Sequence, residues 1–576
     1  MKFYTNPIKI SFMNKITLLI ISILLVASPL LSQTQRLVLI EEGTNASCGP
    51  CGAQNPAFDA LLNQNRDKIT AIKYHWYFPG YDPMHLHNVG ENNARVAYYG
   101  INGVPTAVID GVIPSGAGFS YPGAPSGFSQ NLINQAYAVP SPFSIDLYHY
   151  LSAAQDSIHV VMRITAAQPV SGNYKAQMAV IEKVINFATP PGSNGEKTFH
   201  DVMKKMLPNH LGTAIPTAWE QGDYIILRES WKLANIYDMD ELGVVGFIQE
   251  NGTRSVKQAG NSDPEVFAPL HNTDAAIYNL TNLTATNCSG AYSPVITLAN
   301  YGTNPLTSAE IVYSVNGGSQ QILNWSGNLG FLESEVVALA DISFTVLPQN
   351  ALEITLQNPN GVNDQYVKNN TIVYNFNVAA ATPSEVKLMI KLDNNPEQIT
   401  WDIKNLAGEI VISGGPYTTP GATVNEIINL TENGCYFFTI YDAAGNGIEA
   451  PGFFVLYYGT SSQILSGTAF GSMAKAQFDV GGTVEIAENQ SASVISLYPN
   501  PVQNTGYIEF QLFQQEMAEV FLYDQLGQVI KRIGQERYEP GIIQEVFTTQ
   551  DLKPGVYYIA GRIGAMTLNQ KVVVTQ

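Results

Sequence analysis

The sequence predicts a multidomain fold in which one α/β domain is followed by several all-β sandwich modules. Its 576 residues are too many for a single core, because a domain averages about 150 residues. Charged residues make up 13% of the chain, against about 25% in an average soluble domain. Tyr (30), Gly (48) and Pro (32) are plentiful, which is typical of extracellular β-rich proteins. A strand–helix order occurs only near the N-terminus, and beyond residue 270 alternating strands are separated by Gly, Asn and Pro turns.

The overall charge excludes one class of partner. Lysines and arginines number 29 and acidic residues 48, so the net charge is 29 − 48 = −19, the wrong sign for attracting nucleic acid. A hydrophobic content of 45% also excludes global disorder. Four cysteines are too few for a disulfide scaffold in a chain of this length, so we expect the cysteines to carry chemistry.

The first 32 residues are predicted to be a signal peptide. Three lysines precede an apolar run at residues 16–31, and no acidic residue occurs before Glu41. The run is sixteen residues long, which falls short of the roughly 20 needed for a transmembrane helix. We expect cleavage after Ser32. No cysteine follows the run directly and no later stretch is apolar enough to span a bilayer, so the mature chain is expected to have neither a lipid anchor nor a transmembrane segment.

A redox-type motif follows the first predicted strand. Residues 36–40 form a short apolar run, Cys48-Gly-Pro-Cys51 follows, and a helix is expected over residues 52–65. The unpaired N–H groups and the positive dipole end of a helix N-terminus stabilise a thiolate, so Cys48 is the predicted nucleophile. Cys51, one turn further along, is placed to resolve a mixed disulfide. A static structural disulfide is the alternative interpretation of the pair.

These residues resemble the thioredoxin fold. Pro56 falls where that family kinks its active-site helix, and Gly103-Val-Pro-Thr106 matches its cis-proline loop. The resemblance implies that Pro105 presents backbone beside the cysteines, to which an extended substrate pairs as a strand. It also implies that Glu42 is a buried acid that shuttles the proton of the resolving thiol, and Glu41 takes that position if the alignment slips by one residue.

Departures from the thioredoxin pattern indicate a particular branch. Ser47 replaces the aromatic residue that usually precedes the first cysteine, and residues 75–89 are an extra segment. Together with residues 41–44 and 95–100, these features resemble the Omp28-related thioredoxin-like proteins of Bacteroidetes. We therefore predict a thioredoxin-like domain at 33–135 and a β-rich Omp28-like domain at 140–265.

The extra segment contains residue types that bind metals. Histidine and carboxylate side chains are common zinc ligands, and the segment carries His75, Asp82, His85 and His87. Prolines and a glycine in the same segment favour a loop over a strand, so the preferred interpretation is a loop that shapes a substrate groove over the cysteines.

Two further β modules are predicted downstream, an immunoglobulin-like sandwich at 272–378 and a second sandwich at 384–481. In the second, two turns gather oxygen donors of the kind that calcium prefers. The candidate calcium ligands are Asp393, Glu397, Asp442 and Asn446. Ordinary β-turns are the alternative, since Asn-Gly and Asp-Asn favour turns by themselves. No other cofactor is expected.

The remaining two cysteines, Cys288 and Cys435, lie in different predicted modules. A bridge between them requires two docked sandwiches, because a disulfide needs Cα atoms within about 7 Å. We therefore expect two buried free thiols.

The C-terminal segment, residues 495–576, is expected to be a small antiparallel sandwich. Its Ser496-Leu-Tyr-Pro-Asn-Pro501 start and its Leu552-Lys-Pro-Gly-Val-Tyr-Tyr-Ile559 segment resemble the type A sorting domain of the type IX secretion system. The resemblance implies recognition by the type IX machinery at the outer membrane, and hence a secreted or cell-surface protein that first passes through the periplasm.

Two functions from different classes follow. The first is an exported thiol-disulfide oxidoreductase whose partners are protein thiols and disulfides, and the complete motif of Cys48 and Cys51 with Pro105 favours it. The second is a non-catalytic surface binding or adhesion protein that uses the thioredoxin-like domain as a scaffold. The missing aromatic residue and the trailing β modules favour this second function.

Overall fold

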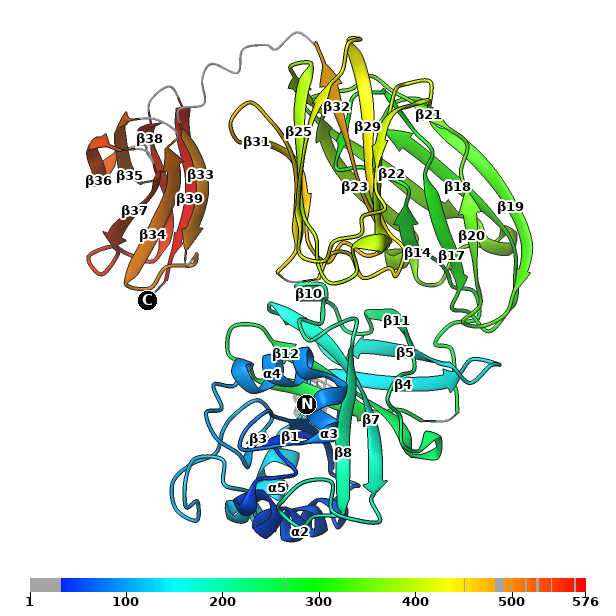
Figure 1. The fold of residues 1–576 in the computed structure, drawn as a ribbon, viewed down its shortest axis with the longest axis vertical. Helices are drawn as coiled ribbons and strands as arrows, with labels where there is room; N and C mark the ends of the chain where they lie inside the picture. Colours follow the sequence, from blue (N-terminus) through cyan, green and yellow to red (C-terminus); the bar gives the residue numbers. More distant parts are fainter. Residues whose placement is uncertain are drawn as a thin grey trace, which may run out of the picture. The chain divides into compact units, whose positions relative to one another are not determined.

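The computed structural model describes residues 33–263, 265–449, 451–481, 492–498, 500–512, 515–524, 528–539, 541–563 and 566–575. The predicted signal peptide, residues 1–32, lies outside the described residues. The chain divides into two units, residues 1–270 and 271–576, and it is multidomain and mostly β (Figure 1). None of the described helices is long and apolar enough to cross a membrane.

A mixed sheet forms the centre of the first unit, with strand order β13-β12-β7-β8-β2-β1-β3 and the short β9 (Thr213–Ala214) beside β7. Its main strands are β1 (Val38–Thr44), β2 (Ile69–His75), β3 (Thr106–Ile109), β7 (Tyr174–Asn186), β8 (Thr198–Leu207), β12 (Leu242–Glu250) and β13 (Val256–Asn261). β1 pairs parallel with β2 and antiparallel with β3, and β2 joins β8 through Lys73 and Val202. The segments that the sequence assigns to two domains, 33–135 and 140–265, therefore share one sheet.

Both faces of β1 and β2 are covered, because every residue of these strands is buried. Val38 and Ile40 pack with helices α2 (Gly49–Asn63) and α5 (Gln130–Tyr137), whereas Leu39 packs with α4 (Val89–Tyr98) on the other side. Successive strand residues point to opposite faces. Any polar residue in these strands is consequently buried against one of two different cores.

A second, three-stranded sheet completes this unit. It is ordered β11-β5-β4 and packs its apolar residues against β7 and β12, as the cluster that includes Met162, Met178 and Val244 shows. Its strands are β4 (Phe143–Leu151), β5 (Ser157–Ala166) and β11 (Tyr224–Lys232). The short strands β6 (Val170–Ser171) and β10 (Ala218–Trp219) pair with each other in a separate two-stranded sheet.

Two helices differ from their sequence-based expectation. α2 begins at Gly49 rather than at residue 52, because Cys48 is its N-cap residue and Pro50 lies in its first turn, where a missing N–H costs nothing. The extra segment, predicted to be a loop, contains the short helix α3 (Pro83–His87). Asp82 accepts hydrogen bonds from the first N–H groups of α3, which explains how it forms in a proline-containing segment.

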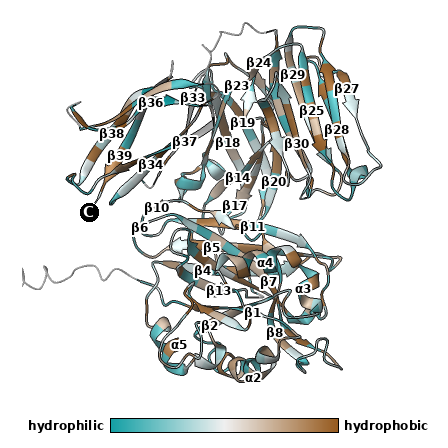
Figure 2. Cartoon of the chain, turned by 60° about the vertical axis from the view of Figure 1, so that its left-hand side comes forward, coloured by the Kyte–Doolittle hydropathy of each residue, from teal (hydrophilic) through white to brown (hydrophobic). Residues whose placement is uncertain are grey.

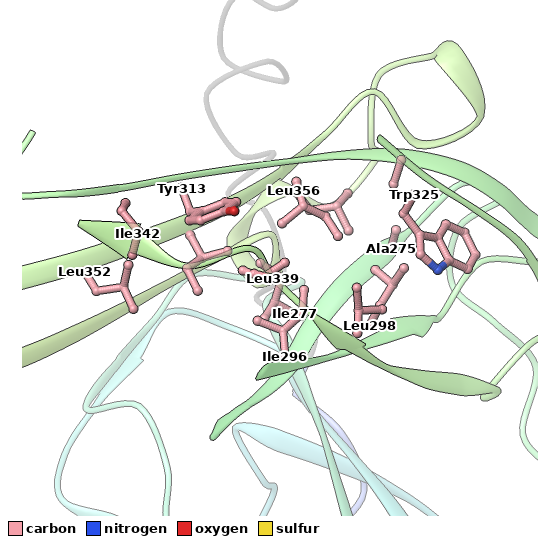
Figure 3. Close-up of a cluster of buried hydrophobic side chains, with 14 of the residues drawn as sticks. Ala275, Ile277, Ile296, Leu298, Tyr313, Trp325, Leu339, Ile342, Leu352 and Leu356 are labelled. Atoms are coloured by element: carbon pink, nitrogen blue, oxygen red, sulfur yellow. The ribbon is translucent and has the colours of Figure 1, made fainter. Parts of the chain in front are cut away.

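The second unit begins with a β-sandwich. Its strands are β14 (Ala275–Thr281), β15 (Thr286–Asn287), β16 (Ala291–Tyr292), β17 (Val295–Asn300), β18 (Leu306–Val315), β19 (Gln321–Leu329), β20 (Ser334–Ala338), β21 (Ile342–Ser343), β22 (Gln349–Gln357) and β23 (Thr371–Val378). They form the sheets β14-β17-β20, β15-β23-β22-β18-β19 and β16-β21. Figure 3 shows the core between the sheets, where Tyr313 and Trp325 lie among aliphatic side chains.

A second sandwich follows, with sheets β24-β32-β29-β26-β27 and β28-β25-β30-β31. Its strands are β24 (Ala380–Thr382), β25 (Glu385–Lys391), β26 (Ile399–Lys404), β27 (Ile410–Gly414), β28 (Thr423–Asn429), β29 (Gly434–Asp442), β30 (Phe453–Tyr458), β31 (Ser462–Gly467) and β32 (Met473–Val480). Apolar residues recur along strands such as β25 and β30 (Figure 2), and their inward side chains fill one core around Phe438 and Phe454.

The C-terminal strands form a third sandwich. Its sheets are β33-β34-β37 and β36-β35-β38-β39, with a core that includes Ile508, Val520 and Val572. The strands are β33 (Ala492–Tyr498), β34 (Thr505–Leu512), β35 (Glu516–Tyr523), β36 (Val529–Tyr538), β37 (Gly541–Thr548), β38 (Gly555–Ile563) and β39 (Met566–Val574).

Candidate functional site

Cys48 and Cys51 are joined by a disulfide at the N-terminus of α2, with Cα atoms 5.2 Å apart. The backbone N–H of Cys51 donates to Sγ of Cys48 over 3.1 Å, so a sulfur atom takes the place of the usual N-cap oxygen. Cys48 is 1% and Cys51 0% exposed. The pair is therefore held at the positive end of a helix but is covered by surrounding chain.

Pro105 lies in the loop that borders the disulfide. The Val104–Pro105 peptide bond is cis, and the carbonyl oxygen of Val104 lies 3.3 Å from Sγ of Cys48. The Tyr121 hydroxyl donates to the Pro105 carbonyl over 2.9 Å, which fixes the far side of the loop. Backbone of the proline loop and the first cysteine are thus direct neighbours.

Glu42 lies in a buried charge cluster on the α2 side of β1. Its Oε2 is 2.9 Å from Nζ of Lys73, and Lys73 also binds Asp59 of α2. Burial raises the pKa of Glu42 to about 7, against the opposing charge of Lys73, and the negative charges of Asp59 and Glu196 raise it further. Lys73 thus lies within ion-pair distance of two carboxyl groups, and the raised pKa of Glu42 is near neutral pH.

Glu41 points to the opposite face of β1, where its carboxylate is fully occupied. Its Oε1 is 2.6 Å from Nη2 of Arg95 and accepts a hydrogen bond from the Tyr74 hydroxyl over 2.8 Å. Tyr99 donates to its other oxygen. Arg95 is fully buried, with its guanidinium 4.8 Å from the centre of the Tyr98 ring. Of the two glutamates, Glu42 is the one on the face that carries α2 and the cysteines.

Ser47, which stands where an aromatic residue was expected, is enclosed by two loops. Its hydroxyl donates to the Tyr81 carbonyl over 2.6 Å and accepts from the Ser193 N–H over 3.1 Å. Gly80 packs closely on this residue, since a Cβ on Gly80 would lie 3.0 Å from the Ser47 Cβ. The segment before Gly80 carries two exposed aromatic side chains, Tyr77 and Phe78, which are 59% and 53% exposed.

The histidines of the extra segment are used in hydrogen bonds. His75 Nδ1 lies 2.6 Å from Asp82, His85 Nδ1 lies 2.8 Å from the His75 carbonyl, and His87 Nδ1 lies 3.0 Å from Lys204. Burial, with the charge of Lys204 adding to it, lowers the pKa of His87 to about 4. Across the described residues, no three His, Cys, Asp or Glu side chains are grouped so as to hold a metal ion.

The four candidate calcium ligands likewise belong to no metal-type cluster in the described part of the chain. Asp442 Oδ2 accepts the N–H groups of Asn446 (2.8 Å) and Gly447 (3.1 Å), and the Asn446 amide donates to Glu449. Asp393 accepts backbone N–H groups with both carboxylate oxygens, and Glu397 lies in a one-turn 3₁₀ helix, Pro396–Gln398. These contacts stabilise turns, and Asp442 Oδ1 is the carboxylate oxygen of these turns that is buried with no hydrogen bond.

The expectation of two free thiols at Cys288 and Cys435 is wrong. They form a disulfide with Cα atoms 5.5 Å apart, which requires the two sandwiches to be docked. Gln477 of β32 reinforces the junction, because its Oε1 accepts the Cys288 N–H over 3.0 Å and its carbonyl accepts the Thr286 hydroxyl over 3.0 Å. Nothing in the sequence indicates this docking, since the partners are 147 residues apart.

Sequence reasoning missed several residues of the site. Lys73 carried a usable signal, because it is the one charged residue in the mostly apolar run Ile69–Tyr74 and therefore needs a buried counter-charge. Asp59 carried a weaker one, as an acid on the helix that begins with the cysteines. Asn194 and Glu196 carried none, because the β7–β8 loop that holds them is distant in sequence, with Asn194 lying 149 residues after its partner Asn45.

Comparison with known proteins identifies the C-terminal part. Residues 496–575 match the family described as a secretion system C-terminal sorting domain. This is the type IX tail that the sequence predicts, and it implies export by the type IX machinery to the cell surface or the medium. The comparison with curated proteins gives no match.

Solved structures give remote similarities. HBP35 of Porphyromonas gingivalis matches at 14% identity and a TM-score of 0.33, over 60% of this chain and 99% of that one. The CARDB domain of a Pyrococcus furiosus protein, solved with di-metal ions, matches at 16% identity and 0.17, over 20% and 95%. A biofilm-associated protein domain matches at 10% identity and 0.14, over 76% and 96%. Similarity at this level assigns no function.

Proposed function

We propose that this protein is an exported thiol-disulfide oxidoreductase of the Omp28-related, thioredoxin-like type. The observation that carries the proposal is the Cys48–Cys51 disulfide, which caps α2 beside the Val104 carbonyl. A helix N-terminus stabilises the thiolate that forms when this disulfide is reduced. In this proposal residues 33–135 are the redox domain, 140–265 complete its sheet, and 272–378 and 384–481 are binding modules that the sorting tail, 495–576, delivers to the surface.

The chemistry is a two-step exchange with a substrate protein. The Cys48 thiolate attacks a substrate disulfide, forming a mixed disulfide and releasing one substrate thiolate. Cys51 then gives its proton to Glu42 and attacks Sγ of Cys48. The Cys48–Cys51 bond forms, the second substrate thiolate leaves, and both thiolates take up protons from solvent. The substrate gains two electrons and the enzyme pair loses two, and the reverse sequence oxidises a substrate dithiol.

A redox titration tests the proposal. The full chain is equilibrated in thiol-disulfide buffers of graded potential, and each cysteine pair is quantified by alkylation and mass spectrometry, so that Cys48–Cys51 and Cys288–Cys435 are read separately. We expect Cys48–Cys51 to be reduced reversibly while Cys288–Cys435 stays oxidised. A Cys48–Cys51 bond that resists reduction as strongly as Cys288–Cys435 does would refute the proposal.

The second candidate is a non-catalytic surface binding protein. The near-complete burial of Cys48 and Cys51 favours it, because attack on a disulfide requires access to a sulfur atom. This candidate predicts that reduction of the pair is slow in the folded chain and that substrate disulfides do not reoxidise it. Stopped-flow exchange with a peptide disulfide distinguishes the two functions.

The sorting tail gives a separate test of delivery. Removal of residues 496–576 leaves the redox site intact, because that site lies in the first unit. We expect the truncated protein to accumulate in the periplasm, as measured by fractionation and surface labelling. Surface labelling equal to that of the full chain would show that the tail is not the address.

A further inference from the structure

The loop between β7 and β8 reaches the redox motif from outside the first three strands. Its ends are tied by the hydrogen bond from the Phe187 N–H to the Lys197 carbonyl (2.8 Å). Its tip binds the residues before Cys48, since the Asn194 N–H donates to the Ala46 carbonyl (3.2 Å) and the Ser193 hydroxyl donates to the Ser47 carbonyl (3.3 Å). The loop is therefore positioned on the active-site segment by specific contacts.

Within this loop, Asn194 fixes Glu196. The Asn194 side chain donates to Glu196 Oε2 and accepts the Glu196 N–H over 2.9 Å, while its amide also lies 3.3 Å from the Asn45 carbonyl. The Glu196 carboxylate also lies near Asn55 of α2, and burial raises the pKa of Glu196 against the opposing effect of the Asn55 amide. Glu196 is only partly buried, so it contacts both the site and the solvent.

Asn55 links Glu196 to the face that carries Glu42. Its side chain donates to the Thr44 hydroxyl over 3.0 Å, and Thr44 lies two residues after Glu42, on the same face of β1. Asn55 also lies one helical turn before Asp59, which binds Lys73. Asn55 and Asp59 of α2 therefore present polar side chains on the side of the helix that lies near both the partly exposed Glu196 and the buried Glu42–Lys73 pair.

The role assigned to Glu196 rests on the proposed function, in which Glu42 must return the proton of Cys51 to solvent. Glu42 is 1% exposed, so a proton that it accepts from Cys51 has no direct exit to water. We propose that Glu196 is a positioning residue for the redox pair: this partly exposed carboxylate, which Asn194 holds beside the face of α2 that carries Asn55, sets how readily Glu42 exchanges its proton with solvent during the Cys51 step.

The charges around Glu42 fix the direction of the expected pH effect. Lys73 faces it from β2, Asp59 from α2 and Glu196 from the β7–β8 loop, and the Tyr121 hydroxyl is near enough to sense its charge. The negative charge of Glu196 raises the pKa of Glu42. Replacing Glu196 by a neutral residue of the same shape therefore moves the titration of Glu42 to lower pH.

The test uses the reduced full chain and an aromatic disulfide reagent that releases coloured thionitrobenzoate. The first release reports attack by Cys48, and the second reports attack by Cys51 on the mixed disulfide. Mass spectrometry verifies that Cys288–Cys435 stays intact. For Glu196→Gln we expect an unchanged first phase, a second phase slowed roughly tenfold near neutral pH, which is below the usual range for a direct acid–base group, and a pH midpoint shifted downward.

Controls separate the outcomes. Glu196→Asp should restore much of the second phase, and Glu241→Gln, a partly buried glutamate of the same unit, should leave both phases unchanged. A Glu196→Gln variant with the wild-type second phase and pH profile would overturn the inference while leaving the oxidoreductase intact. A wild-type chain that shows no second phase would instead overturn the proposed function.

Discussion

The two disulfides of this chain differ in the length of the loop that each closes and in the part of the fold where each lies. Cys48 and Cys51 are 3 residues apart at the start of one helix, whereas Cys288 and Cys435 are 147 residues apart and join two sandwiches. In the chain-entropy description, closing a loop of 147 residues restricts the unfolded chain by about 5 kcal/mol, and closing the short loop by less than about 2 kcal/mol.

The surroundings of the two bonds reinforce this difference. Cys48–Cys51 lies at a helix N-terminus, in the unit that also holds the buried, titratable Glu42, and the proposed function couples its reduction to charge and protons. Next to Cys288–Cys435 lies the neutral side chain of Gln477, whose Oε1 accepts a hydrogen bond from the Cys288 N–H. The comparison teaches that the short disulfide adds little stability, whereas the long one stabilises the docking of the two sandwiches.

The largest expected effect concerns the short disulfide. Cys48→Ser should abolish disulfide exchange, because the nucleophile is missing, whereas Cys51→Ser should accumulate mixed disulfides on Cys48, because the resolving step is missing. Gel shift and mass spectrometry of trapped complexes measure this. Trapping on Cys51 in the Cys48→Ser variant, with none in Cys51→Ser, would reverse the assignment of the two roles.

The next effect concerns the long disulfide. A Cys288→Ser, Cys435→Ser double variant should lose up to about 5 kcal/mol of unfolding free energy in the two sandwiches, as measured by denaturant titration of the full chain. Its exchange kinetics at Cys48 should match the wild type, because the first unit contains the whole redox site. Equal unfolding free energies with and without the Cys288–Cys435 bond would show that the bond does not stabilise the fold.

How far the sequence predicts these features depends on their range. Cys48, Cys51 and Pro105 belong to short motifs, so neighbouring residues in the sequence are enough to predict them. Glu42 and Glu41 could not be separated by motif alone, and the strand register decides, because adjacent residues of β1 face different cores. Glu196 and the Cys288–Cys435 bond depend on contacts between distant segments, and their partners carry no local signature.

A smaller expected effect is a pH dependence of stability in the unit that contains Cys48–Cys51, which the disulfide-linked sandwiches should not share. The folded pKa of Glu42 is about 7 against an ordinary value of 4.5, so the folded state holds the proton more tightly than the unfolded state. The associated stability is fully present below pH 4.5 and is lost as the pH rises to about 7, on the order of 3 kcal/mol in total.

Glu42→Gln should flatten this slope, because the amide does not titrate. Unfolding free energies of the first unit, measured from pH 4 to pH 8, provide the check, and Glu241→Gln is the control. A wild-type stability that rises through this window would contradict a raised Glu42 pKa. The transition of the disulfide-linked sandwiches should not follow this slope.

The smallest expected effect concerns calcium at the second sandwich, which the long disulfide already stabilises. Asp442 Oδ1 is buried without a hydrogen bond, and backbone carbonyls of the adjoining turns are the kind of donor that calcium accepts. Extracellular calcium modules bind at about 0.1 to 1 mM. At 10 mM calcium and a Kd of about 1 mM, linkage adds about 1.4 kcal/mol to the stability of the folded state.

We therefore expect a small rise in the melting temperature of the sandwich transition in calcium relative to chelator, measured by calorimetry on the full chain. Asp442→Ala should erase the rise, and Asp341→Ala, in the neighbouring sandwich, should keep it. The turns already bind Asp393 and Asp442 through backbone N–H groups, so the fold does not require the ion. Identical melting in calcium and in chelator would leave Asp442 as a turn-stabilising residue only.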